Sequence, residues 1–224
     1  MANYIPIVTI DGPTCSGKGT ISRLLARDLD WNLLDSGALY RILALRAKEN
    51  SILPDDYESI SYLTKGLNAR FILDREGECV LLNNQDVTSK IRQEDCGILA
   101  SKLAQFKEVR EALHVIQRSF ILPPGLVADG RDMGTIVFPE ALIKIFLEAN
   151  TEVRAVRRHK QLKEKGINVS LPDLSREISE RDIADRNRSL SPLKPADGSY
   201  YLDSSDLTVS QTLEKVKEFV ENII

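Results

Sequence analysis

The chain has 224 residues, a formal net charge of −3 and a hydrophobic fraction of 42%, which suffices for one sizeable core with an insertion. The negative net charge argues against a general nucleic-acid binder, because such proteins need a positive field to displace counterions from phosphates. No apolar run approaches the length of a membrane span and the first residues do not begin a secretory signal, so we expect a cytoplasmic protein without a membrane partner. We also expect a monomer.

Cysteine and histidine usage gives no sign of a structural metal. The three cysteines, Cys15, Cys79 and Cys96, form no C-x-x-C pair and leave at least one thiol unpaired. This usage is typical of a reducing cytosol, so we expect neither a disulfide nor a zinc site. The two histidines, His114 and His159, fall in expected helices with no second His or Cys at ligand spacing. A histidine base or a histidine-built metal site is therefore not expected.

The first expected unit is a strand, a turn and a helix. Residues 5–10 are short, rich in β-branched side chains and bounded by Gly and Pro, which is typical of a strand buried on both faces of a sheet. A helix is expected over residues 20–29, because their apolar side chains recur on one helical face. The turn between them reads Gly12, Pro13, Thr14, Cys15, Ser16, Gly17, Lys18, Gly19 and Thr20.

The composition of this turn is typical of a phosphate-binding loop. Gly12 and Gly17 allow backbone conformations closed to residues with a Cβ, so successive amide N–H groups can converge on an anion. The dipole of the following helix favours the same anion, and Lys18 can reach the outer phosphates as a mobile charge. We predict that residues 12–20 bind ATP; the alternative is a strand-turn-helix with ordinary turn glycines.

One position departs from the usual P-loop pattern. Gly19 follows Lys18 where Ser or Thr is usual, and the hydroxyl arrives one residue later at Thr20. Whether the loop supplies a direct Mg²⁺ ligand is therefore open. The run Gly-Lys-Gly-Thr resembles the loop of nucleoside monophosphate kinases, which implies Mg²⁺ bound with ATP and held mainly through phosphates and water, with Thr20 as a candidate ligand.

A second strand is expected at residues 31–35, followed by a helix through residues 36–45. Ser36 is a natural N-cap of that helix, and capping is the alternative to a role in binding. Arg41 lies one turn into the helix, near the end where the helix dipole disfavours a cation. A bound anion would explain the position of Arg41 better than stability does.

From about residue 63 the pattern changes from parallel α/β units to antiparallel strands. Residues 69–73 and 79–82 predict a β-hairpin whose turn contains Gly77, and residues 86–88 predict a short third strand. A helix is expected from about Ser89 to about Ala104. We predict an inserted α+β subdomain at 63–104, with 1–62 and 105–224 forming the core. The likeness of the Gly-Lys-Gly-Thr loop to that of nucleoside monophosphate kinases implies that this insertion binds the nucleoside monophosphate.

The next expected helix, residues 107–121, carries Arg110 in its first turn, where a cation gains nothing from the dipole. A third buried strand is expected at residues 126–129. Ligands of open α/β sheets collect at the carboxyl ends of such strands, so Asp129 is a candidate to act on Mg²⁺ through water; the alternative is that it caps a turn. Strands at 143–147 and 200–203 and a helix at 208–224 complete an expected parallel five-stranded P-loop sheet flanked by helices.

The densest run of arginine lies in residues 153–190. Two sets of residues fall on single faces of successive expected helices: Arg154, Arg157 and Arg158, then Arg181, Asp185 and Arg188. The alternative is a solvated surface with i,i+4 pairs, Glu177 with Arg181 and Asp182 with Arg186. Many fixed charges between two core strands are what a lid closing over a nucleotide would need, so we predict a helical lid here.

Four groups of residues together resemble the bacterial cytidylate kinase family, nearly end to end. They are Asp11-Gly12-Pro13 with Gly17-Lys18-Gly19-Thr20, Leu34-Asp35-Ser36-Gly37-Ala38 with Tyr40-Arg41, Asp129-Gly130-Arg131-Asp132-Met133-Gly134-Thr135, and Arg181-Asp182 with Asp185-Arg186-Asn187-Arg188. The resemblance implies transfer of the γ-phosphoryl group of ATP to CMP or dCMP. It implies catalysis by Lys18, Arg131 and Arg188, and ATP binding by Arg157 and Arg158 in addition to the loop.

The resemblance also implies how CMP is bound. It implies that the cytosine edge is contacted by Ser101, Arg110 and Asp132, and that the sugar is contacted by Arg181 and Asp185. It also implies that the acceptor phosphate is bound by Ser36, Arg41, Arg131 and Arg188, with Tyr40 in the same site. Guanidinium groups suit phosphate oxygens and the cytosine carbonyl, and an acidic acceptor suits the exocyclic amine.

Two other functions stay open. A phosphate acceptor is already mostly ionised at neutral pH, so its phosphorylation needs no base. A kinase acting on a hydroxyl would need a carboxylate base, and Asp35 or Asp132 is available for that role. A nucleotide-switched GTPase should carry an Asn-Lys-x-Asp guanine-recognition sequence, which this sequence lacks.

Overall fold

The computed structural model describes residues 5–73, 78–164 and 166–221. The chain divides into two compact units. One unit joins the chain up to Ile7 with Ala26–Asp129, and the other joins Val8–Leu25 with Gly130–Ile224. None of the described helices has the length and apolar character needed to cross a bilayer.

The described strands are β1 (Ile7–Asp11), β2 (Asn32–Asp35), β3 (Ala69–Leu73), β4 (Glu78–Leu82), β5 (Gln85–Asp86), β6 (Leu126–Gly130), β7 (Ile143–Glu148) and β8 (Tyr200–Asp203). The helices are α1 (Lys18–Leu29), α2 (Ser36–Glu49), α3 (Tyr57–Tyr62), α4 (Thr88–Ile91), α5 (Glu94–Leu103), α6 (Lys107–Arg118), α7 (Thr151–Glu164), α8 (Leu171–Asn187) and α9 (Val209–Glu221). A short π-helix, η1, spans Met133–Val137.

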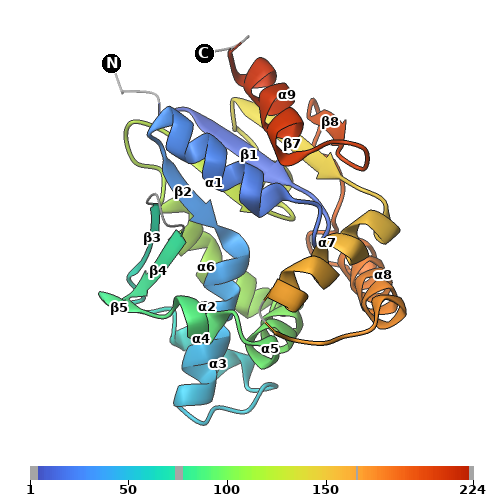
Figure 1. The fold of residues 1–224 in the computed structure, drawn as a ribbon. Coiled ribbons are helices and arrows are strands. Elements are labelled where there is room, and N and C mark those ends of the chain that lie inside the picture. The colour runs from blue at the N-terminus through green and yellow to red at the C-terminus, as the bar shows by residue number, and fades with distance from the viewer. Residues whose placement is uncertain (1–4, 74–77, 165, 222–224) are drawn as a thin grey trace. The chain divides into compact units, whose positions relative to one another are not determined.

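The strands form a five-stranded sheet with the order β2-β6-β1-β7-β8 and a separate three-stranded sheet with the order β3-β4-β5 (Figure 1). Within the larger sheet β2 pairs with β6, β1 with β7, and β7 with β8, all in parallel. Every residue of β1 and β6 is buried, as expected for strands covered on both faces. The predicted parallel five-stranded α/β sheet and the separate antiparallel strands are confirmed.

In the first unit, the register of β2 and β6 places Asp35 opposite Asp129 at the carboxyl ends of both strands. Helix α2 packs against α4, α5 and α6, and α3 packs against α6. The antiparallel strands β3 and β4 form the predicted hairpin, whose predicted turn at residues 74–77 lies outside the described residues. Two acidic side chains therefore share one edge of this part of the sheet.

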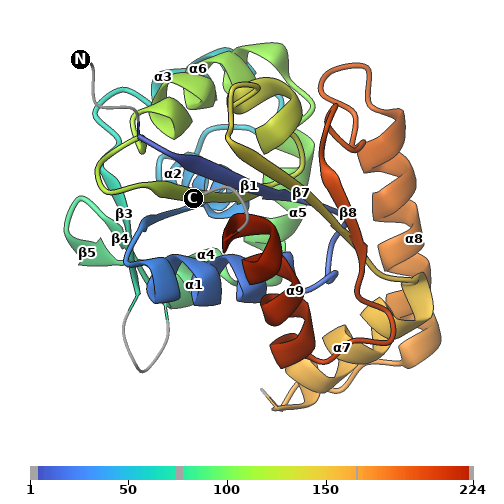
Figure 2. The ribbon, with the colours of Figure 1, turned by 90° about the horizontal axis from the view of Figure 1, so that it is seen from above.

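In the second unit, the loop after β1 leads into α1, and the chain leaves β7 directly into α7. Helices α7 and α8 lie side by side in both views (Figures 1 and 2). A small apolar cluster joins them, with Ala155 from α7 and Leu174 and Ile178 from α8. This unit therefore holds the predicted phosphate loop together with the arginine-rich helices.

The structure corrects several predicted boundaries. Helix α1 begins at Lys18 rather than at Thr20, because the carbonyl of Gly17 accepts from the amides of Thr20 and Ile21 at 3.0 Å each and so closes the first turn. Helix α6 ends at Arg118, before the predicted residue 121. Helix α9 begins at Val209 and is described as far as Glu221. Helix α3 and the π-helix were not predicted.

The single helix predicted from about Ser89 to about Ala104 is wrong, because two helices, α4 and α5, occupy this stretch. The chain breaks at Gln93, whose φ of −62° and ψ of 148° are extended. The predicted third strand ends early, at Asp86, because Thr88 already begins α4. The N-cap of α2 is also different from the prediction. Asp35, rather than Ser36, caps this helix by accepting from the amide of Ala38 at 2.9 Å.

Candidate active site

The loop between β1 and α1 needs glycine at both ends, for two different reasons. A Cβ at Gly12 would lie 2.0 Å from the carbonyl oxygen of Leu147, at the end of β7, so no larger residue fits. A Cβ at Gly17 would make only an ordinary contact with Arg157, at 3.9 Å, but Gly17 adopts a φ of +97°, which residues with a Cβ rarely adopt. Cys15 also has a positive φ, of 59°. The backbone is therefore tightly curved here, as the predicted phosphate loop requires.

Lys18 and Thr20 both lie in the first turn of α1, whose N-terminal dipole favours an anion at the loop. The ammonium of Lys18 donates across the loop to the carbonyl of Pro13 at 3.3 Å. The hydroxyl of Thr20 accepts from Arg23 at 3.4 Å. Among the described residues, no group of three or more His, Cys, Asp or Glu side chains could hold a metal ion.

Two arginines of α7 donate to carbonyl groups on the loop. Arg154 reaches the carbonyl of Thr14 at 3.1 Å, and Arg157 reaches the carbonyl of Ser16 at 3.0 Å. Arg157 also donates to the hydroxyl and carbonyl of Ser204, at 3.1 and 2.6 Å. Burial lowers the pKa of Arg157 from its ordinary value, against the opposing charge of Asp203. Arg157 therefore supports the loop backbone, a role that the sequence did not reveal.

The buried carboxylate of Asp11, at the end of β1, binds the segment that carries Arg131 and Asp132. Its two oxygens accept from the amides of Met133 and Gly134 at 2.8 Å each. Burial raises the pKa of Asp11 from 3.8 to about 7, against the lowering effect of the two amide donors. Asp11 was not predicted as a site residue, although an acidic residue directly before the first glycine of the loop was a usable signal.

Arg131 lies in a cluster of charges with Asp185 of α8 and with Arg188, the C-cap residue of that helix. Its Nε donates to Asp185 at 2.8 Å, and Arg188 lies 3.9 Å from the other oxygen of Asp185. Burial acts to raise the pKa of Asp185, but Arg131, through its charge and its hydrogen bond, outweighs burial and holds that pKa below its ordinary value. The sequence had associated Asp185 with Arg181, whereas the structure pairs it with Arg131.

Of the two i,i+4 pairs considered for the arginine-rich helices, Asp182 with Arg186 is replaced by longer-range pairs. Asp182 pairs with Arg154 of α7, and Arg186 pairs with Glu148 at the end of β7. Two arginines of the predicted lid, Arg154 and Arg157, therefore have fixed partners within the protein. Arg158 follows on α7 and is half-buried.

In the first unit, Ser36 is buried in the first turn of α2, where its hydroxyl accepts from Gln117 of α6 at 2.9 Å. Arg41, one turn later, donates to the carbonyl of Ile91 at 2.9 Å, at the C-terminus of α4. Space for this guanidinium comes from Gly97, since a Cβ there would lie 2.8 Å from it. Arg41 thus satisfies helix-terminal carbonyl groups, in addition to any role in binding.

Arg110, in the first turn of α6, likewise donates to a carbonyl group at the C-terminal end of another helix, α5. Its guanidinium donates at 3.2 Å to the carbonyl of Ala104, the C-cap of that helix. Ser101 lies on α5 itself and is half-buried, while Tyr40 of α2 is buried. Asp129 is buried at the end of β6. The predicted CMP residues of this unit are thus Ser36, Tyr40, Arg41, Ser101 and Arg110, and those of the other unit are Arg131, Asp132, Arg181, Asp185 and Arg188.

A parallel sheet whose first strand leads through a glycine-bounded loop to a helix beginning with lysine defines a P-loop nucleotide-binding fold. The family model for cytidylate kinase matches residues 8–222. The chain belongs to the cytidylate kinase family, and it is accordingly a phosphotransferase of the nucleoside monophosphate kinase class.

Two similar proteins match this chain over nearly its whole length. A cytidylate kinase from Shewanella denitrificans is 50% identical over 223 residues, covering 99% of this chain and 98% of that protein. One from Nitrosococcus oceani is 50% identical over 218 residues, covering 96% of each. A shikimate kinase structure from Bacteroides thetaiotaomicron covers 97% of this chain and 99% of its own, with 13% identity and a TM-score of 0.47, and is too distant to bear on activity.

Proposed function

We propose that this protein transfers the γ-phosphoryl group of ATP to CMP or dCMP, giving ADP and CDP or dCDP. The observation that carries the proposal is that one compact unit holds both the curved loop before α1 and the Arg131, Asp185 and Arg188 cluster, with Asp11 bonded to the segment after Arg131. A curved loop of amides suits a nucleoside triphosphate, and fixed guanidinium groups suit an acceptor that is itself a phosphate.

The phosphoryl transfer needs positioning and charge neutralisation more than covalent chemistry. In our proposal the amides of residues 12–20 hold the ATP phosphates, and Arg157 and Arg158 act beside that loop. Lys18, Arg131 and Arg188 offset the charge that develops on the transferred group. None of these residues has to accept a proton, because the acceptor phosphate is already ionised near neutral pH.

In our proposal, each part of the acceptor has its own set of side chains. Ser101, Arg110 and Asp132 contact the cytosine edge, and Arg181 and Asp185 contact the sugar. The acceptor phosphate is bound by Ser36, Arg41, Arg131 and Arg188, with Tyr40 beside them. We also propose that residues 63–104 act as the acceptor-binding insertion between core segments 1–62 and 105–224, that residues 153–190 act as the lid, and that the protein is a cytoplasmic monomer.

Mg²⁺ fits the donors that the chain offers. Thr20 supplies a hydroxyl in the first turn of α1 and Asp129 a buried carboxylate at the end of β6, and oxygen ligands are those that Mg²⁺ prefers. In our proposal Thr20 is the candidate direct ligand and Asp129 acts through water, so the phosphates of ATP and water would supply most of the coordination. The bound ion would supply positive charge to the phosphates during transfer.

A substrate screen tests this function directly. The purified protein is incubated with ATP, Mg²⁺ and each nucleoside monophosphate in turn, and the diphosphates formed are separated and counted. CMP and dCMP should be the fastest acceptors. Exclusive phosphorylation of an alcohol from a parallel panel, or slow GTP hydrolysis without any acceptor, would overturn the proposal.

A further inference from the structure

Arg154 is the most completely bonded cation in the described part of α7. Its side chain is 3% exposed, and its Nε donates to the carbonyl of Ala149 at 2.8 Å. One terminal nitrogen donates to the Thr14 carbonyl at 3.1 Å and to Asp182 at 3.0 Å, and the other donates to the Thr151 hydroxyl at 3.0 Å and to Asp182. A guanidinium has five N–H donors, so every donor of Arg154 has an acceptor.

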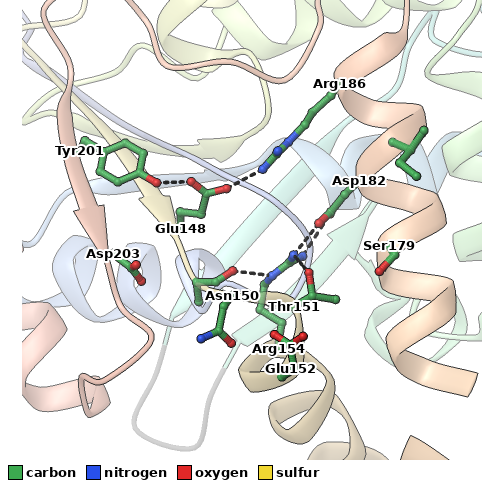
Figure 3. Close-up of a pocket in the computed structure, with 12 residues that line it drawn as sticks. Glu148, Asn150, Thr151, Glu152, Arg154, Ser179, Asp182, Arg186, Tyr201 and Asp203 are labelled. Atoms are coloured by element: carbon green, nitrogen blue, oxygen red, sulfur yellow. Dashed lines mark hydrogen bonds and ion pairs between the residues drawn. The ribbon is translucent and has the colours of Figure 1, made fainter. Parts of the chain in front are cut away.

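Figure 3 shows this arrangement at a pocket of about 480 Å³. Arg154 extends from α7 toward Asp182 of α8, while Arg186, also on α8, points instead to Glu148 (Figure 3). The two arginines thus have similar acidic partners, but of these two described side chains only Arg154 donates to the loop, at Thr14. Arg186 is therefore a natural control for Arg154.

The bond to Thr14 fixes the direction of one loop amide. A trans peptide is planar, so the carbonyl of one residue and the N–H of the next point to opposite sides. When Arg154 holds the Thr14 carbonyl toward α7, the N–H of Cys15 must point away from α7. Arg157 does the same for the Ser16 carbonyl and the N–H of Gly17. The two arginines thereby set alternate peptide planes of the loop.

We infer that Arg154 is a positioning residue for the triphosphate, which acts by presetting the loop amides and makes no contact with substrate itself. The inference rests on the proposed function. Asp182 holds the fork of Arg154 in place, and it lies three residues before Asp185, on the same face of α8. The charge cluster of Arg131 and the ATP loop are thus connected through one helix.

A purely structural role is the competing explanation. Arg154 and Asp182 join α7 to α8 beside the apolar contact of Ala155 with Leu174 and Ile178, and the pair could serve only to hold the helices together. That role predicts a less stable protein whose folded molecules still bind ATP normally. The positioning role predicts weaker ATP binding by folded protein.

The test is equilibrium binding of a non-hydrolysable ATP analogue with Mg²⁺ to folded Arg154→Lys. Lysine keeps the charge but cannot reach Asp182 and Thr14 together, because it lacks the fork. We expect the Kd to rise about tenfold, because a loop that is no longer preset has to be ordered when the analogue binds, and the Kd for CMP to change less than twofold. Thermal unfolding without nucleotide shows that the folded fraction is intact.

Asp182→Asn is a milder variant for the same test, since it keeps an acceptor for Arg154 but removes the charge. Its Kd for the analogue should rise less than that of Arg154→Lys, and the double variant should show less than the product of the two effects, because both act through one bond network. Arg186→Lys, the same change on a guanidinium paired with Glu148, should leave the Kd unchanged.

The outcomes separate the inference from the function on which it rests. Wild-type protein that fails to bind the analogue overturns the proposed function. Wild-type protein that binds it while folded Arg154→Lys binds equally well overturns the positioning role alone. A rise in Kd for Arg186→Lys as large as that for Arg154→Lys overturns it too, because the effect would not depend on the loop carbonyl.

Discussion

Asp11 shows how one carboxyl at the end of β1 can relate stability to pH. Its pKa is raised to about 7 in the fold and is 3.8 ordinarily. Between these two values the unfolded chain has lost the proton while the folded protein still holds it. The unfolded state then binds fewer protons, so the contribution of Asp11 to the free energy of unfolding falls as pH rises from about 4 to 7.

We therefore predict that urea unfolding midpoints fall between pH 5 and pH 8 more steeply in the wild type than in Asp11→Asn. Asparagine offers one acceptor to the two amides of Met133 and Gly134, so the variant should also be less stable throughout, by about 1–3 kcal/mol. Parallel pH curves for the two proteins would show that Asp11 does not titrate in this range.

The position of Arg110 has two explanations, base reading and helix capping, which predict different kinetics. If it reads cytosine, Arg110→Met should lower kcat/KM for CMP by about ten- to a hundredfold, as for one charge-assisted hydrogen bond. The KM for ATP should change little, and the preference for CMP over UMP should shrink, as it also should in Asp132→Asn. If Arg110 only caps α5 through Ala104, stability falls while the CMP to UMP ratio stays constant. Steady-state kinetics with both acceptors decide between these cases.

At the scale of elements, the arginine-rich helices should respond unequally to nucleotide. Helix α7 is already anchored through Arg154 and Arg157, whereas the buried residues of α8 end at Asp182. We predict that ATP analogue and CMP together slow amide exchange over residues 183–188 and leave residues 154–158 unchanged. Hydrogen exchange read by mass spectrometry would show it, and an equal gain in α7 would contradict it.

The sequence predicts β1, the loop and α1 well because the signals are local: a buried β-branched run, two glycines and a helical apolar face. It misses the break at Gln93, which carries neither Pro nor Gly. It misassigns the cap of α2 because Asp35 and Ser36 are both good capping residues and adjacent. Only the backbone geometry, in which the Asp35 side chain meets the amide of Ala38, distinguishes them.

The partners of the guanidinium groups could not be predicted from the sequence, for a different reason. Arg154 meets Asp182, and Arg157 meets Ser204, across 28 and 47 residues of chain. Spacing rules reach three or four residues along a helix, so they suggested Asp182 with Arg186 instead. The acidic residues were correctly placed on helical faces, but the packing of α7 on α8 decides which of them meet.

At the scale of the whole molecule, the predicted ATP residues all lie in one compact unit, and the predicted CMP residues are divided between both. Substitutions in the first unit should therefore affect the two substrates differently. We predict that Arg41→Met raises the KM for CMP at least tenfold and leaves the Kd of an ATP analogue within twofold.

Arg46→Met is the matched control, since Arg46 also lies on α2 and also donates to a backbone carbonyl, that of Leu63 at 2.7 Å. It should lower stability without raising the KM for CMP. Equal effects of the two substitutions on CMP would mean that Arg41 acts only by supporting its helices.

The glycines of the chain differ in how readily another residue can replace them during evolution. At Gly12 the obstacle is the backbone oxygen of Leu147, 2.0 Å from any added Cβ, and no choice of side chain avoids it. Gly198 has nothing within 4 Å and only a φ of +71° to satisfy, a conformation that Asn and Asp adopt several-fold more often than other side chains. Evolution can therefore replace Gly198 while the fold is kept. A replacement of Gly12 would disrupt the loop, so Gly12 should stay unchanged in related proteins.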